Sequence, residues 1–152
     1  MERERADAIR ASLCLVRTPR QILEQSVTIA VVGASRDPEK PAHEVPAQMH
    51  RHGWRIIPVN PYADELWGQR VYPLLAEIPE PVDLVNVFRP STDAAAIVRQ
   101  AVDIGAHAVW LQQGIVSAEA RQIAEEAGID FVEDSCIAVV RAATGLTRNI
   151  KA

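Results

Sequence analysis

The segment from Val31 to Ser35 is the part of the sequence whose residue types point most directly to ligand chemistry. A β-branched run ends in Gly33, and Ser35, Arg36 and Lys40 follow in a short polar loop. A glycine lets main-chain atoms approach a ligand closely, and the helix expected after this loop would offer unpaired amides to an anion. A serine hydroxyl and two cations would add to that attraction. The pattern is typical of phosphate binding, although a plain tight turn with solvated cations fits the same residues.

Two familiar nucleotide motifs are absent from this region. The loop does not read GxGxxG, because Gly33 is the only glycine between Val32 and Gly53. An NAD site also requires an acidic residue at the end of the second strand, and this chain has Asn60 there. No Walker-type GxxxxGK[ST] is present. The sequence therefore disfavours NAD binding and P-loop nucleotide hydrolysis.

Other residues that could do chemistry give weaker signals. Cys136 follows the last predicted strand, near a helix start, where the helix dipole stabilises a thiolate. A buried structural cysteine fits the same position, so both interpretations stay open. His50 and His52 lie two residues apart on a predicted helix, point to different sides and therefore cannot share a metal ion. We expect no metal, and no motif in the chain supports catalysis.

Short β-branched runs that alternate with helical stretches predict the elements that carry these residues. We expect strands at 27–32, 55–59, 82–88, 107–111 and 129–132. This order predicts an α/β protein with a Rossmann-like, doubly wound, mainly parallel five-stranded sheet and flanking helices. Because the carboxyl ends of parallel strands share one edge, the residues that follow each strand should meet there and bind the ligand.

The rest of the chain divides into three predicted parts. Residues 1–25 form a short helical N-terminal extension, 26–145 the Rossmann-like domain, and 146–152 a C-terminal tail. Within the extension, Thr18 and Pro19 resemble a helix cap with proline at the first position. We expect the helix after the glycine loop to start near Ala42 or His43, since Pro46 would break a helix interior, and the last helix to begin near Asp134. The connection containing Trp67 and Tyr72 is expected to be a loop that covers the sheet.

The overall composition excludes several classes of protein. The chain has 152 residues, 48% hydrophobic and 24% charged, values typical of one globular domain. Its formal net charge of −4 gives no general attraction to nucleic acid or anionic lipid. The longest nearly unbroken apolar run, Val27 to Ala34, is far shorter than the roughly 20 residues of a membrane helix. With two cysteines and a charged N-terminus, we expect a cytoplasmic protein that binds neither nucleic acid nor membrane.

An ordered series of short motifs resembles a known family. The motifs are Val31–Ser35, Lys40–Pro41, Pro58–Pro61, Gly68 with Val71–Pro73, Val85–Arg89, Trp110–Gly114 and Asp134–Cys136. In this order they resemble the small stand-alone CoA-binding proteins, which are similar to the N-terminal CoA-binding domain of the succinyl-CoA synthetase α subunit. The resemblance covers residues 20–140. It implies a protein that holds coenzyme A, or an acyl-CoA, noncovalently.

The resemblance also implies which residues hold each part of that ligand. The diphosphate would lie over Gly33, Ala34 and Ser35, with Lys40 nearby. The nucleotide would be lined by Val59, Asn60 and Pro61, and the wall beside the adenine or the 3′-phosphate would be formed by Phe88, Arg89 and Pro90. The pantetheine would lie near Gln113 and Gly114. Cations common around the cysteine in this family are absent at Ser135 and Ala138, which puts a charge-dependent role for Cys136 in doubt.

The function implied is that of a binding or regulatory module without its own catalysis. The phosphorylated histidine of succinyl-CoA synthetase belongs to a different domain, so ligase chemistry does not come with the fold. The alternative is an enzyme, either a nicotinamide-dependent oxidoreductase or an acyl-CoA-transforming activity that uses Cys136. A homodimer is expected from the general frequency of two-fold assemblies.

Overall fold

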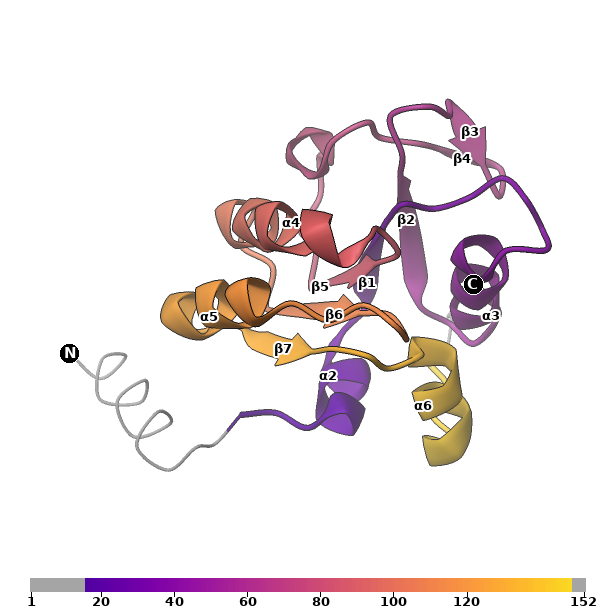
Figure 1. The fold of residues 1–152 in the computed structure, drawn as a ribbon. Helices are drawn as coiled ribbons and strands as arrows, with labels where there is room; N and C mark the ends of the chain where they lie inside the picture. Colours follow the sequence, from indigo (N-terminus) through magenta and orange to yellow (C-terminus); the bar gives the residue numbers. More distant parts are fainter. Residues whose placement is uncertain (1–15, 149–152) are drawn as a thin grey trace.

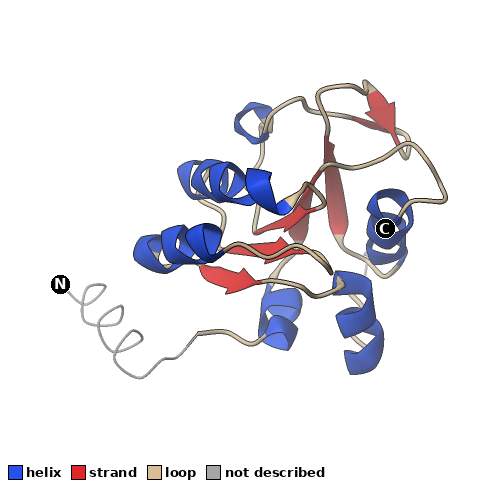
Figure 2. Cartoon of the chain, viewed as in Figure 1, coloured by secondary structure: helices blue, strands red, loops and turns tan. Residues whose placement is uncertain are grey.

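A parallel sheet between two layers of helices makes up the protein (Figures 1 and 2). The computed structural model describes residues 16–148. The five strands of the sheet are β1 (Thr28–Val32), β2 (Arg55–Val59), β5 (Leu84–Val87), β6 (Ala108–Leu111) and β7 (Asp130–Val132), and they pair in the order β2-β1-β5-β6-β7. Every pairing is parallel. The predicted Rossmann-like, doubly wound sheet is therefore confirmed, with its change of winding direction between β1 and β5.

Helices cover both faces of this sheet. Figure 1 shows α4 (Ser91–Asp103) and α5 (Ala118–Ala127) on one face, and α2 (Pro19–Gln25), α3 (Pro41–Arg51) and α6 (Ile137–Thr144) on the other. Successive side chains of a strand point to opposite faces, so Ile29 and Val31 join the α2–α3–α6 core while Ala30 joins the α4–α5 core. A short 3-10 helix, η1 (Leu75–Glu77), adds Leu75 to the latter core.

Local signals set the helix ends much as the sequence predicts. Thr18 accepts a hydrogen bond from the Gln21 amide in a capping box, with Pro19 at the first position of α2. Ser117 caps α5 by accepting from the Ala120 amide at 3.1 Å, and Gly128 ends that helix in a left-handed conformation. Side-chain oxygens at these positions satisfy amides that the first helical turn leaves unpaired.

The segments at the two ends of the described chain pack into the same core as the sheet. Ile22 and Leu23 of α2 are fully buried, and Trp54 Nε1 donates to the Leu23 carbonyl at 3.2 Å. At the other end, the Arg148 amide donates to the His52 carbonyl at 2.8 Å. The part of the predicted extension before residue 16, with Cys14, and the last four residues of the tail lie outside the described residues.

α3 starts at Pro41, one residue before the expected Ala42, and Pro46 lies inside it. Two local expectations prove wrong. α6 starts three residues after Asp134, which adopts a left-handed conformation (φ 51°) instead. The predicted covering loop contains a small antiparallel hairpin of β3 (Glu65–Leu66) and β4 (Gln69–Arg70). Its turn residues, Trp67 and Gly68, both have positive φ, as two-residue hairpin turns require. Trp67 still packs against the core beneath it.

Gly53 offers a test of how the C-terminal segment is held. Its φ is +104°, and a Cβ there would lie 2.0 Å from the Arg148 carbonyl oxygen, whereas a Cβ on Gly105 (φ +79°) would meet nothing within 4 Å. We expect both Gly53→Ala and Gly105→Ala to lose about 1–2 kcal/mol of unfolding free energy from backbone strain. Gly53→Ala should lose at least about 1 kcal/mol more, because it also displaces Arg148. Equal losses in urea unfolding would contradict this packing.

Candidate functional site

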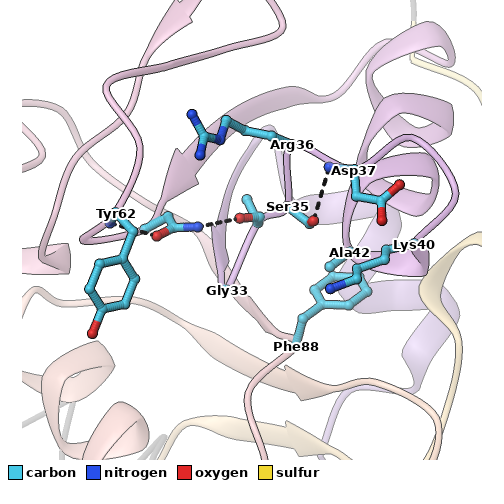
Figure 3. Close-up of a pocket in the computed structure, with 10 residues that line it drawn as sticks. Gly33, Ser35, Arg36, Asp37, Lys40, Ala42, Tyr62 and Phe88 are labelled. Carbon is cyan, nitrogen blue, oxygen red and sulfur yellow. Dashed lines mark hydrogen bonds between the residues drawn. The ribbon is translucent and has the colours of Figure 1, made fainter.

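The carboxyl edge of the sheet carries a pocket beside the change of winding direction (Figure 3). This central pocket has a volume of about 450 Å³. Its lining comes from the loop after β1, the start of α3, and the residues after β2 and β5: Gly33, Ala34, Ser35, Arg36, Asp37, Lys40, Ala42, Asn60, Tyr62 and Phe88. Open α/β sheets bind ligands at this position, so the geometry defines a candidate ligand site.

Two further pockets adjoin the central pocket, one on each face of the sheet. The α4-side pocket, of about 370 Å³, shares Gly33, Asn60 and Tyr62 with it. The α6-side pocket, of about 510 Å³, shares Lys40, Ala42 and Phe88 with it. The three pockets together form a path that crosses the sheet edge from the α4 face to the α3–α6 face. An elongated ligand fits such a path better than a compact one.

Gly33 sits where the path crosses the sheet edge. Its φ is +88°, a conformation that L-residues rarely adopt. A Cβ at this position would lie 3.1 Å from Arg89 Cδ and 3.3 Å from the main-chain carbon of Phe88. Only glycine therefore combines this bend with the close approach of the segment after β5.

Side chains from two other elements hold the carbonyl oxygens of the glycine loop. Asn60 Nδ2 donates to the Ala34 carbonyl at 2.7 Å, and the Asn60 side-chain oxygen accepts from the Tyr62 amide. His43 Nδ1 lies 2.7 Å from the Ser35 carbonyl, and Trp67 Nε1 donates to His43 Nε2 at 3.3 Å. A carbonyl can only accept, so His43 carries its proton on Nδ1. Carbonyl oxygens that would repel an anion are thus already paired.

The loop offers fewer free amides than its glycine suggests. The Gly33 amide donates to Val59 and the Ser35 amide to the Ala42 carbonyl, at 3.0 and 3.1 Å. Within the described chain, the amides of Ala34 and Arg36 have no hydrogen-bond partner. The Ser35 hydroxyl oxygen accepts from the Asp37 amide at 3.1 Å, which leaves its hydrogen free to donate. Because Ala34 is fully buried, an anion would meet the Arg36 amide and this hydroxyl.

Pro46 explains why the Ala42 carbonyl is available to Ser35. A proline inside a helix has no amide hydrogen, so the carbonyl four residues before it receives no helical hydrogen bond. In α3 that carbonyl belongs to Ala42, and the Ser35 amide takes the vacant place. Pro46 thereby ties the glycine loop to α3.

Positive charge outweighs negative charge in the central pocket. Arg36 and Lys40 line it together with one carboxylate, Asp37, and Figure 3 shows Lys40 next to Phe88, with Tyr62 on the far side of Gly33. Arg89 lines the α4-side pocket and pairs with Asp93 at 3.0 Å. Both side chains of that pair are about half exposed, so the pair is weak and leaves Arg89 able to turn to a ligand.

Glu44 in the first turn of α3 is a second carboxylate near this site. Arg51 pairs with it at 3.0 Å. The hydrogen bond from Arg51 lowers the pKa of Glu44, with a smaller contribution from Gln48. The negative charge of Glu44 is thereby balanced within α3 and does not oppose an anion at the pocket.

The α6-side pocket ends at Cys136, a partly buried free thiol. Cys136 is the residue that immediately precedes α6. The pocket is lined by Lys40, Pro41, Ala42, Val45, Phe88, Gln112, Gln113, Ile115 and Cys136. Most of these side chains are apolar, so the pocket suits a largely uncharged chain.

Ten of the twelve predicted site residues line one or more of the three pockets. The exceptions are Pro90, which precedes α4 as its N-cap residue, and Gly114, whose amide donates to Asp134 Oδ1 at 2.7 Å. Ala34 is fully buried, with its methyl group in the core. The individual contacts of the twelve residues with a ligand stay predictions.

Sequence reasoning missed several lining residues. Tyr62 is 85% exposed and lines both the central and the α4-side pocket, and an aromatic residue directly after Asn60-Pro61 is a signal that was available. Gln112 directly follows the strand predicted at 107–111, which was also a signal, whereas Val45 gave none, because only the packing of α3 brings it to the pocket.

Two other kinds of site are absent from residues 16–148. No group of three or more His, Cys, Asp or Glu side chains is placed to hold a metal ion there. In the same range, no helix has the length and apolar character needed to cross a membrane.

Fold and site together define a Rossmann-like domain with a candidate ligand site at the carboxyl edge of its sheet. Residues 27–142 match the family model described as "CoA binding domain", and the chain belongs to this family.

Named relatives agree with this assignment. The chain is 41% identical over 125 residues to the uncharacterized protein YneT of Bacillus subtilis, which covers 82% of this chain and 93% of YneT. A Thermus thermophilus structure, "cell-free ID.343", superimposes with a TM-score of 0.78 at 39% identity, covering 82% of this chain and 94% of that one. The acetate–CoA ligase [ADP-forming] II subunit alpha of Pyrococcus furiosus is 40% identical over 63 residues, which are 41% of this chain and 14% of the subunit.

Replacing Pro46 tests the link between α3 and the glycine loop. In Pro46→Ala, a new amide competes with Ser35 for the Ala42 carbonyl, so the Ser35 amide should exchange with solvent about tenfold faster or more. The Gly33 amide, bonded to Val59, is the internal control and should not change. Amide hydrogen exchange followed by NMR measures both. An unchanged Ser35 rate would show that the loop does not depend on this carbonyl.

Proposed function

We propose that this protein binds coenzyme A, or an acyl-CoA, noncovalently across the carboxyl edge of its sheet. The observation that carries the proposal is the path of three adjoining pockets with its cations at the crossing point. Coenzyme A has an adenosine end, a central diphosphate and an uncharged pantetheine arm. The nucleotide, charged and uncharged parts of coenzyme A come in the same order as the α4-side, central and α6-side pockets along the path.

Each pocket suits one part of that ligand. In the central pocket the diphosphate would meet the free Arg36 amide, the Ser35 hydroxyl and the Lys40 ammonium group. In the α4-side pocket the nucleotide would lie along Val59, Asn60 and Pro61, with Arg89 as the cation for the 3′-phosphate. The mainly apolar α6-side pocket would take the pantetheine arm, with Gln113 at its rim.

A nicotinamide-dependent oxidoreductase fits the same edge less well. The residue after β2 that would hold an adenine ribose is Asn60, and both ends of its side chain are already bonded, to Ala34 and to Tyr62. It therefore lacks the carboxylate that NAD recognition uses, and its side-chain amide is already held by these two bonds.

An acyl-CoA-transforming enzyme is favoured by one observation, the position of Cys136 in the α6-side pocket. The described residues of that pocket include no histidine or carboxylate to activate the thiol. We therefore propose a carrier, sensor or partner subunit, acting in the cytoplasm as a homodimer, in preference to an enzyme.

Calorimetric titration of the purified protein separates these alternatives. We expect coenzyme A to bind more tightly than NAD or NADP, because its phosphates and its uncharged arm match separate pockets. Tighter binding of NAD(H) would overturn the proposal in favour of an oxidoreductase. Binding of none of these ligands would leave an interaction protein that keeps the fold alone.

Removing single positive charges along the path tests where the phosphates of coenzyme A bind. Lys40→Ala and Arg89→Ala should each weaken coenzyme A binding by about 1–3 kcal/mol through lost charge-assisted contacts. The effect of Arg89→Ala should lie at the lower end, because Arg89 must first leave Asp93. Arg99→Ala is the matched control: Arg99 lies on α4, pairs with Glu119 and lines none of the three pockets. Unchanged affinity in both site variants would refute this arrangement.

A further inference from the structure

The α6-side pocket contains a polar group that the general function leaves unexplained. Gln112 directly follows β6 and is only 5% exposed, yet it lines this mainly apolar pocket. Its side-chain oxygen accepts two hydrogen bonds, from the Ile137 amide at 3.0 Å and from Asn86 Nδ2 at 3.2 Å. Because the Ile137 amide can only donate, the orientation of the Gln112 amide is fixed.

This orientation places the side-chain nitrogen of Gln112 on the side of the planar amide that points away from Ile137 and Asn86. In the described part of the chain it donates to no protein atom. The fully enclosed side-chain polar atoms without a partner, over the same residues, are Ser26 Oγ and Arg141 Nε. The Gln112 nitrogen thus keeps some accessible surface, and Gln112 lines the α6-side pocket. A donor with no protein acceptor beside a mainly apolar pocket can donate to a ligand acceptor without breaking a protein hydrogen bond.

The position of Gln112 identifies which part of a ligand it would meet. Gln112 is bonded to Ile137, the neighbour of Cys136, whereas the central pocket joins this pocket at Lys40, Ala42 and Phe88. The Gln112 amide therefore lies toward the α6 end of the path, where the far end of the pantetheine arm would be. A free thiol is a weak acceptor, whereas a thioester carries a carbonyl oxygen beside the sulfur.

We propose that the preferred ligand is an acyl-CoA thioester, whose carbonyl oxygen accepts a hydrogen bond from Gln112 Nε2. This inference rests on the proposed function and names the form of its ligand. The positive end of α6, which starts next to Gln112, adds to the attraction for a carbonyl oxygen. Asn86 holds Gln112 in this orientation, because its side-chain nitrogen donates both to the Gln112 side-chain oxygen and to the Trp110 carbonyl.

Three ligands separate the effect of the thioester carbonyl on affinity from the effect of the added carbon atoms. They are coenzyme A, acetyl-CoA and S-ethyl-CoA, a thioether of nearly the same size as acetyl-CoA that lacks the carbonyl. Calorimetry on the wild-type protein should give acetyl-CoA an affinity about two- to tenfold higher than S-ethyl-CoA and coenzyme A. Equal affinities for all three would overturn this inference and leave coenzyme A binding intact. Failure of all three to bind would overturn the proposed function itself.

A conservative variant assigns the preference to Gln112. Gln112→Glu keeps an oxygen for Ile137 and Asn86 but replaces the donating nitrogen by an acceptor, so the preference for acetyl-CoA over S-ethyl-CoA should disappear. Gln113→Glu is the matched control, because it adds the same charge at the exposed next residue of the same pocket. It should weaken all three ligands together and keep their ratio. A preference that survives in a folded Gln112→Glu protein would refute the role of Gln112, and the wild-type comparison decides the ligand class even where that variant does not fold.

Discussion

The hydrogen bond from the Ser35 amide to the Ala42 carbonyl fixes the shape of the loop on which the candidate site depends. Pro46 leaves this carbonyl unpaired inside α3, and Ser35 occupies it. With Asn60 on the Ala34 carbonyl and His43 on the Ser35 carbonyl, the loop is tied to β2 and α3 at once. A loop held this way keeps its remaining amides in place before any anion arrives, which reduces the ordering cost of binding.

This constraint also explains how one small domain can accommodate a long ligand. The glycine bend lets the segment after β5 approach β1 closely, and the path therefore crosses the sheet edge without a gap between the α4-side and central pockets. Charge is concentrated at the crossing, in Arg36 and Lys40, while the pocket on the α6 face is mainly apolar. Overall net charge is negative, so the attraction for phosphate is local.

Much of the site could be located from the sequence, because its position follows from topology. Residues that come directly after parallel strands must share one edge, and Gly33, Asn60 and Phe88 meet there as expected. The bond from Ser35 could not be predicted, because the effect of Pro46 on its own helix is local, whereas the amide that uses the freed Ala42 carbonyl comes from outside the helix. α6 starts later for a similar reason. The Asp134 side chain accepts a hydrogen bond from the Gly114 amide, and the side-chain oxygen of Gln112 accepts from the Ile137 amide, the first amide of the helix.

The sequence by itself determined the five strands of the parallel sheet, the helix cap at Thr18 and the bend at Gly33, since periodicity, capping and a positive φ are properties of neighbouring residues. Tertiary structure alone decided which polar groups face the ligand. The free nitrogen of Gln112 is an example, because its partners Asn86 and Ile137 are 26 and 25 residues away in the chain. Hydrogen-bond pairing across such separations depends on how the whole sheet and its helices pack, so no local pattern can reveal which donor stays unpaired.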